Sequence, residues 1–400
     1  MSDSSPSLSP ASYGQPVDVW FYPAEIENDL KDVVTIPIHL IHETLACSWE
    51  YTRCVIPTFT NWNRYIAFTR IIIIGIIAEF DGALVDITAS DLVLGYDLGH
   101  LFEILFTGTP GHIEMAQEYR AFLLITAEKS SRRQGSELFR RYVNVLAESP
   151  KTWFRLRDCD ALVRFTIAAA LACNDFDDVW FNEDQLQILA ELGDTLYDAV
   201  AFYKHRAEGE TNSTFAYVSS ELRESAFRCC REILWALDVA WAKSPSHRVV
   251  INFLRPFGGP IHMMMRRYRF VEDGLVIGKP DTDHVVKQTR LHFKLWNRID
   301  STHEYHAESA RYLDALGRSD RLMFTGLVGL LENAAEKCTH CQYRQSYGAE
   351  GVGGFGGVKL CDPCHEDWQT FVESFPQRAS ATFPEIAHFK VEFPGKRSGR

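Results

Sequence analysis

The sequence predicts an all-α protein with a small metal-binding module near its C-terminus. Three observations support this fold class. Apolar residues recur at helical spacing from about Pro23 to Arg321, the alternation typical of strands is rare, and two Cys-x2-Cys pairs follow near the end of the chain. The chain has 400 residues, 46% of them hydrophobic, and can therefore bury a large core in one big domain or two ordinary ones.

Four segments carry the helical pattern most clearly. The Ile-rich run at 71–74 would favour a strand by its β-branched residues, but it continues the spacing of Trp62, Tyr65 and Phe68, so we expect a helix. Residues 161–173 predict an Ala-rich buried helix, and residues 185–206 and 221–243 predict two amphipathic ones. The acidic residues 174–178 are interpreted as a helix-terminal loop, with a metal-ligand set as the alternative.

Composition divides the chain into four parts. Residues 1–16 are rich in Ser and Pro, without a basic start or an apolar stretch, and predict a disordered arm rather than a signal peptide. We expect a helical domain over 17–336, a zinc-binding module with a C-terminal helix over 337–390, and a flexible tail over 391–400. The most apolar run, at 71–78, is too short to cross a bilayer. Ten cysteines without an export signal favour the reducing cytoplasm. Nothing in the sequence indicates an oligomeric state.

The clearest local motif is a pair of Cys-x2-Cys turns, formed by Cys338, Cys341, Cys361 and Cys364. Their spacing matches a four-cysteine zinc site, and four thiolates leave no open coordination position, so this zinc is expected to be structural. The alternatives are two turns that bind no metal, or a site in which His340 or His365 substitutes for a cysteine ligand. The other six cysteines are expected to be buried thiols.

The formal net charge of −12 argues against a nucleic-acid partner, because phosphate backbones bind basic surfaces. A small phosphate-bearing molecule remains compatible, because local arginines can bind it. Carboxylates and arginines in an apolar helical domain point to class I terpene chemistry. That reaction needs Mg²⁺ on carboxylates, cations that bind diphosphate and aromatic side chains around a carbocation.

The usual Asp-rich motif of such enzymes is missing. Glu79, at the end of the Ile-rich helix, could replace it unless it lies at a solvated helix end, and Asp198 weakly resembles part of the second metal motif. Four further side chains occur along the chain in the order expected of groups that bind diphosphate. Arg157 and Arg164 precede Asp198, and Arg267 and Tyr268 follow it.

Four blocks resemble the fungal α-ionylideneethane synthases, which begin abscisic acid biosynthesis. They are residues 49–57, 153–165, 193–210 and 258–270, and the similarity extends from about Trp20 through the cysteine module. The resemblance implies farnesyl diphosphate as substrate and 2Z,4E-α-ionylideneethane as product. It also implies Glu43 and Glu79 as the Mg²⁺-binding pair. A more distant similarity to tropolone-pathway humulene synthases implies a class I helical bundle, a binuclear Mg²⁺ site and a lysine on the diphosphate, for which Lys294 is the first candidate and Lys287 the second.

The implied reaction passes through neutral hydrocarbons that must be protonated again, so a proton shuttle is required. The candidate groups are titratable near neutrality or become so on burial: His112, Glu118, His205 and His262. The released diphosphate is the alternative base. Two other functions stay open, namely a farnesyl diphosphate cyclase that forms another hydrocarbon such as humulene, and a non-enzymatic adaptor built around the zinc module.

Overall fold

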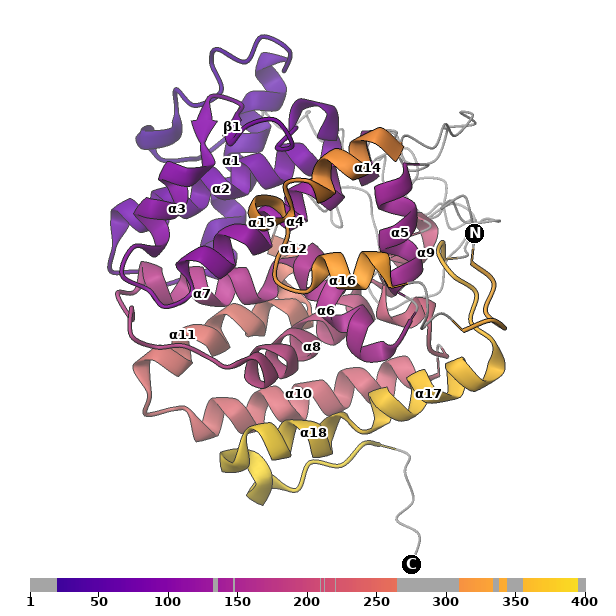
Figure 1. Ribbon diagram of the computed structural model, residues 1–400. Helices are drawn as coiled ribbons and strands as arrows, with labels where there is room; N and C mark the ends of the chain where they lie inside the picture. Colours follow the sequence, from indigo (N-terminus) through magenta and orange to yellow (C-terminus); the bar gives the residue numbers. More distant parts are fainter. Residues whose placement is uncertain are drawn as a thin grey trace, which may run out of the picture.

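The computed structural model describes residues 20–131, 136–146, 148–208, 210–211, 213–219, 221–264, 309–333, 338–343 and 355–394. The expected arm at 1–16 and the last residues of the tail lie outside these ranges. Within them, helices dominate, and the strands form a two-stranded antiparallel hairpin of β1 (Leu92–Val93) and β2 (Tyr96–Asp97), with Leu92 opposite Asp97. The all-α prediction is confirmed (Figure 1).

The helices of the first half are α1 (Ile38–Val55), α2 (Trp62–Phe80), α3 (Leu98–Phe106), α4 (His112–Ser130), α5 (Glu137–Leu146), α6 (Pro150–Ala161), α7 (Val163–Cys173) and α8 (Glu183–Val200). Those of the second half are α9 (Phe202–Glu208), α10 (Leu222–Ala240), α11 (Pro245–Leu254), α12 (Pro260–Met264), α14 (Ser309–Leu316), α15 (Ser319–Leu322), α16 (Leu327–Glu332), α17 (Asp362–Glu373) and α18 (Phe375–Thr382). Short 3-10 turns are η1 (Ala24–Ile26), η2 (Gly82–Leu84), η3 (Thr214–Ala216), η4 (Arg255–Gly258) and η6 (Pro384–Phe389).

The Ile-rich run forms part of α2 and is buried, so the helix expected there is confirmed. The Ala-rich segment forms α7, in which every residue is buried. The helix expected over 185–206 is instead two helices. Ala201, at φ −81° and ψ 3°, leaves the α-helical path and separates α8 from α9.

Residues 174–178 form a loop after α7, as expected. Asp175 adopts a positive φ of 57°, and its carboxylate accepts hydrogen bonds from the Thr60 hydroxyl (2.6 Å) and the Asn61 side-chain amide (2.9 Å). The carboxylate of Asp177 pairs with Arg64. These acids therefore hold the connection between α1 and α2 against the end of α7.

Helices α2 and α4 lie side by side and run parallel. The Tyr119 hydroxyl donates to the carbonyl oxygen of Ile71, and two to three turns further along both helices the Ser130 hydroxyl donates to the carbonyl oxygen of Ala78. The backbone N–H of Gly82 donates to the same Ser130 hydroxyl at 3.0 Å. A Cβ at Gly82 would lie 2.4 Å from the carbonyl oxygen of Ala127, so only glycine fits this close approach. The C-terminal ends of α2 and α4 thus adjoin.

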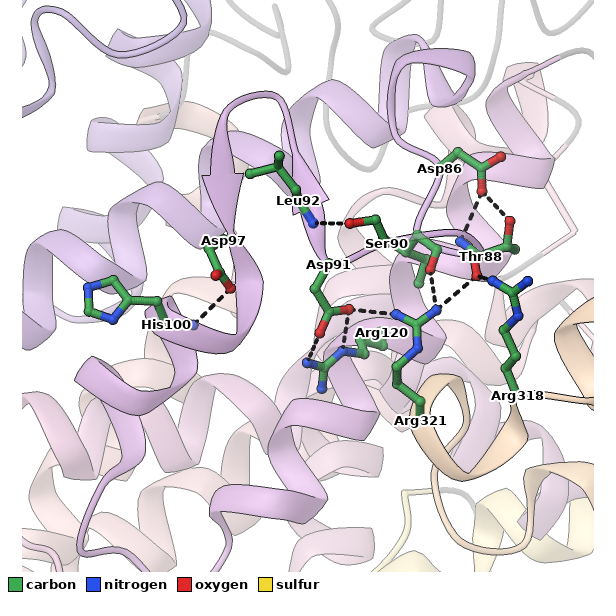
Figure 2. Close-up of polar contacts among 11 residues, drawn as sticks. Asp86, Thr88, Ser90, Asp91, Leu92, Asp97, His100, Arg120, Arg318 and Arg321 are labelled. Atoms are coloured by element: carbon green, nitrogen blue, oxygen red, sulfur yellow. Dashed lines mark hydrogen bonds and ion pairs between the residues drawn. The ribbon is translucent and has the colours of Figure 1, made fainter.

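Arginines join the segment with α14 and α15 to residues 86–91, as Figure 2 shows. Asp91 accepts hydrogen bonds from Arg120 on α4 and from Arg321 on α15, each with a closest N···O distance of 2.6 Å. Arg318 donates to the carbonyl oxygen of Thr88. Two parts of the chain far apart in sequence are therefore held together by one half-buried carboxylate and its neighbours.

Helices α17 and α18 pack on α10, and α17 also contacts α6 (Figure 1). Trp368 on α17 is 1% exposed and lies between the rings of Trp153 and Tyr217, while Arg378 on α18 pairs with Glu191 on α8. The C-terminal part of the chain thus contains two helices where one was expected. Both share the hydrophobic core of the bundle.

Candidate functional site

A buried group of charged side chains lies where the C-terminal ends of α4, α6 and α8 meet α9. We call it the Arg157 cluster, and its members are Lys129, Arg157, Asp160, Asp194, Asp198 and His205. Asp160 bridges two cations, with 3.0 Å from Oδ1 to Lys129 Nζ and 3.0 Å from Oδ2 to Arg157 Nη1. Arg157 Nη2 lies 2.9 Å from Asp198 Oδ1, and His205 Nδ1 lies 3.6 Å from the same oxygen.

The second carboxylate oxygen of Asp198 is also engaged. Oδ2 accepts hydrogen bonds from the backbone N–H of Thr214 (2.6 Å) and from its hydroxyl (2.8 Å). Asp198 is fully buried, so removing any of these donors would leave a buried charge short of partners. Asp198 therefore fixes Arg157 on one side and the segment with η3 on the other.

Charge in the Arg157 cluster is close to balanced. Burial opposes the charge of Arg157, but Asp198, Asp194 and Asp160 outweigh it and hold its pKa well above the usual value. Burial raises the pKa of Asp194, only partly offset by Arg157, and the neighbouring carboxylates raise it further. Protonation of Asp194 is thereby favoured, and the guanidinium of Arg157 stays charged.

An aromatic ring connects this cluster to two histidines. Tyr197 lies with its ring centroid 5.8 Å from the guanidinium carbon of Arg157, 5.6 Å from the ring of His205 and 4.5 Å from that of His262. His262 is 1% exposed and belongs to α12, which packs on α1. The structure thus brings together two of the predicted proton-shuttle residues beside one buried cation.

The predicted Mg²⁺ ligands lie on the first helix pair. Glu79 follows Ala78, which is hydrogen-bonded to Ser130, the residue after Lys129, so the end of α2 adjoins the Arg157 cluster. Glu43 lies on α1, which packs against α2. The short connection between the two helices makes the pair antiparallel. Trp49 lies 5.7 Å from Tyr65 between ring centroids. Glu43 and Glu79 therefore lie on two neighbouring antiparallel helices.

The four cysteines predicted to bind zinc come together. One ligand atom from each of Cys338, Cys341, Cys361 and Cys364 lies within 4.8 Å of every other, and Cys361 Sγ is 3.7 Å from Cys338 Sγ and 3.8 Å from Cys341 Sγ. A tetrahedral ion with bonds of about 2.3 Å to sulfur separates its ligands by about 3.8 Å. Within the described ranges, no other group of three or more His, Cys, Asp or Glu side chains converges in this way.

The local backbone favours the thiolate form of one of these cysteines. Backbone N–H groups of His340 and Cys341 stabilise the thiolate of Cys338 and lower its pKa to about 6. An antiparallel bridge between Gln342 and Lys359 holds the two turns together, with N···O distances of 2.9 and 3.1 Å. The other six cysteines are free and buried, as expected. The four thiols are thus close enough together to hold one metal ion.

Comparison with known proteins identifies the family. Residues 18–385 match the family described as alpha-ionylideneethane synthase aba3. The chain belongs to this family. An alpha-ionylideneethane synthase aba3 of Botryotinia fuckeliana (strain B05.10) is 62% identical over 376 residues, which cover 94% of this chain and 85% of the relative. Proteins named alpha-ionylideneethane synthase abl3 are 57% identical in Leptosphaeria maculans, covering 93% of this chain and 87% of the relative, and 49% identical in Pyricularia oryzae, covering 92% and 83%.

In this member of the α-ionylideneethane synthase family, two predicted site residues lie in a separate ion-pair network. Glu118 is bound by both terminal nitrogens of Arg155, at 2.8 and 2.7 Å, and Arg164 pairs with Asp158 and Glu183. The Arg155 guanidinium carbon also lies 3.7 Å from the ring centroid of Phe324. Glu118 and Arg164 therefore join α4, α6, α7 and α8 and lie outside the Arg157 cluster.

His112 is the first residue of α4 and Lys129 is near its last, so helical rise separates them by about 25 Å. The structure does not bring His112 to the Arg157 cluster. Arg267, Tyr268 and Lys294 lie outside the described residues. No helix in the described ranges is both long and apolar enough to cross a membrane.

Sequence reasoning missed Lys129, Asp160 and Thr214. Asp160 lies three residues after Arg157 on a helix, a spacing that indicates an ion pair. Lys129 lies in the last turn of a helix that is mostly buried from Met115 onward, and a buried lysine requires an acidic partner. Thr214 carries no local signal, because its contact with Asp198 depends on how the chain returns after α9.

Proposed function

We propose that this chain converts farnesyl diphosphate to 2Z,4E-α-ionylideneethane and diphosphate, as a carbon–oxygen lyase at the start of abscisic acid biosynthesis. The observation that carries this proposal is the 62% identity, over 94% of the chain, to a protein named for that synthesis. The structure adds support, because a buried cluster that contains the cations of Lys129 and Arg157 lies with aromatic side chains in one helical bundle.

Glu43 and Glu79 are the residues proposed to hold Mg²⁺, which neutralises charge on the departing diphosphate. Magnesium commonly binds through one or two carboxylates together with water and substrate phosphate, so a cluster of three acids is not required.

Arg157 is proposed to bind the diphosphate together with Arg267, Tyr268 and Lys294. Asp198 serves as the residue that holds Arg157 and Thr214 in place. Arg164 acts less directly, by fixing Asp158 and Glu183 at the junction of α6, α7 and α8.

The reaction begins when the allylic carbon–oxygen bond breaks and its electron pair leaves with the diphosphate. Loss of a proton then gives a neutral polyene, and protonation at another carbon gives the cation that closes the ring. The cyclic cation finally loses a proton to give the neutral hydrocarbon. Of the four predicted shuttle residues, His205 and His262 are the best placed, because both flank Tyr197 beside Arg157. Glu118 and His112 lie elsewhere.

Zinc is the proposed ion for the four-cysteine site, where it would be structural, since four thiolates fill its coordination sphere. A reducing compartment such as the cytoplasm fits ten cysteines that are all free in the structure.

Incubation of the protein with farnesyl diphosphate and Mg²⁺ tests this function. We expect diphosphate release and a hydrocarbon that co-elutes with α-ionylideneethane in gas chromatography. Glu79→Gln should lose diphosphate release, whereas Glu103→Gln on the exposed surface of α3 should keep it. Release of diphosphate with a different hydrocarbon would favour another cyclase, and no release from the parent protein would favour the adaptor.

A further inference from the structure

The four-cysteine site lies next to a segment that the candidate site depends on. Two parts of the chain leave this metal site and reach residues 210–217. One is the extended stretch that precedes Cys361, and the other is α17, which begins directly after Cys361 and carries Cys364. The same residues 210–217 carry Thr214, whose backbone and side chain hold Asp198.

The extended stretch makes the first connection. The backbone N–H of Gly356 donates to the carbonyl oxygen of Glu210 at 3.1 Å, and Phe355 packs edge-to-face on Phe202 with 5.6 Å between ring centroids. Gly357 has φ +94°, and a Cβ there would lie 3.0 Å from the Tyr217 hydroxyl. This stretch therefore lies against Glu210, Thr211 and Tyr217, and a glycine is required at the contact.

Helix α17 makes the second connection. Trp368 follows Cys364 by one helical turn and stacks on Tyr217, with 4.9 Å between ring centroids and 28° between planes. It also meets Trp153 on α6 at 5.6 Å, and Trp153 precedes Arg157 by one turn. Both Trp368 and Tyr217 are 1% exposed, so the stack is part of the core and not a surface contact.

We propose that the metal-bound four-cysteine site positions residues 210–217. Through Thr214 and Asp198 it then orients the guanidinium of Arg157, which is proposed to bind the diphosphate. Gly357, Trp368 and Thr214 are positioning residues in this arrangement and do not touch substrate. Metal binding fixes the two Cys-x2-Cys turns, because the ion links the turn of Cys338 and Cys341 to the turn of Cys361 and Cys364. The Gln342–Lys359 bridge also joins these two turns. The role of Arg157 in turnover rests on the proposed function, whereas the control of residues 210–217 by the metal does not.

Hydrogen exchange measures this control without reference to activity. The full-length protein would be compared with and without zinc, after removal by a chelator and confirmation of metal content. We expect backbone exchange in residues 213–217 and at Gly356 to become about tenfold faster or more, while the fully buried helix α7 stays protected. Returning Zn²⁺ should restore protection and turnover together.

A glycine pair supplies a matched comparison that keeps the metal bound. Gly357→Ala and Gly326→Ala both place a side chain at positive φ, +94° and +96°, but only Gly357 faces residues 210–217. Gly357→Ala should speed exchange at 213–217 and lower kcat by about tenfold to a hundredfold, since small misplacements have effects of that size. Gly326→Ala should change neither. Trp368→Phe, which keeps a ring against Tyr217, should retain more turnover than Trp368→Ala.

Unchanged exchange at 213–217 in both the zinc-free protein and Gly357→Ala would overturn the inference. Altered exchange with unchanged turnover would show that the metal controls residues 210–217 but not the chemistry, which would also refute the proposal as stated. If the zinc-free protein unfolds, Gly357→Ala and the Trp368 variants decide the outcome. Failure of the parent protein to turn over farnesyl diphosphate would instead reject the proposed function and leave the exchange result intact.

Discussion

The guanidinium of Arg157 and the carboxylate of Asp198 form a pair at 2.9 Å that is almost wholly removed from water, with side chains 6% and 0% exposed. Neither group could be buried alone without a large desolvation cost, and each has further partners. Asp160 lies on the other side of Arg157, and Thr214 lies on the other side of Asp198. The pair therefore joins α6 and α8 to the segment that follows α9.

Replacing Asp198 with Asn should destabilise the fold by about 3–5 kcal/mol, because Arg157 would lose a buried counter-charge. The free energy of unfolding from urea titration measures this change. Glu224→Gln is the control, since Glu224 pairs with Arg228 on the exposed face of α10 and should change stability by less than about 1 kcal/mol. Equal effects of the two substitutions would contradict the assignment of the buried pair.

Incubation in deuterated water tests the proton shuttle. Because the proposed path protonates neutral hydrocarbons again, we expect deuterium in the product. His205→Ala or His262→Ala should still release diphosphate but accumulate acyclic farnesene-type trienes, since ionisation does not need the shuttle. His112→Ala should keep the parent's product ratio, because His112 lies at the far end of α4. Glu118→Gln should act through stability, as its carboxylate is bound by Arg155. Parent-like products from both His205→Ala and His262→Ala would assign proton transfer to diphosphate.

Metal analysis should find about one zinc per chain. Cys361→Ser should lose the zinc and melt at lower temperature, because metal binding and folding are coupled. His340→Ala should keep both the zinc and the melting temperature if the four cysteines are the whole ligand set. A Cys361→Ser protein that lost zinc and melted like the parent would show that the metal has no part in stability.

Acid should destabilise the contact between residues 86–91 and the segment with α14 and α15. Burial opposes ionisation of Asp91, but Arg120 and Arg321 outweigh it and lower its pKa, and Arg311 with Thr88 lowers that of Asp86. A carboxylate whose pKa is lower in the folded state stabilises the protein above its unfolded value of about 3.9, and this stabilisation is lost as the pH falls through the folded value.

Asp91→Asn should accordingly reduce the slope of unfolding free energy against pH between about pH 5 and pH 2, the range in which such carboxylates take up protons. Asp320→Asn, at an exposed position on α15, should leave that slope unchanged. Urea titrations across this pH range provide the comparison. The prediction fails if the two variants show the same slope.

The helices and the cysteine site could be predicted from sequence because their signals are local. The Ile-rich run in α2 continued a spacing set three turns earlier, and the cysteine turns carry their own geometry. The break at Ala201 was missed because nothing near it in sequence disrupts the apolar pattern.

The candidate site was only partly predictable because it is made by contacts between distant helices. Arg157 lies on α6 and Arg164 on α7, and the chain changes direction between them at Leu162, which has a φ of 56°. Both arginines are buried, yet one faces Asp198 and the other faces Asp158 and Glu183. Which face of a helix a neighbour covers depends on packing, and spacing alone does not give it. The same reason explains why Lys129 and Thr214 were not foreseen.

The close approach of α2 and α4 at Gly82 has a consequence for how much error the site tolerates. A Cβ at this position would sit 2.4 Å from the Ala127 carbonyl oxygen and 2.4 Å from the Ser130 hydroxyl, closer than real side chains are found. Any larger residue would act as a wedge between the ends of the two helices, one of which carries Glu79 and the other Lys129. The distance between these two helix ends is therefore set by contact with the main chain at Gly82, and substitutions of side chains elsewhere leave it unchanged.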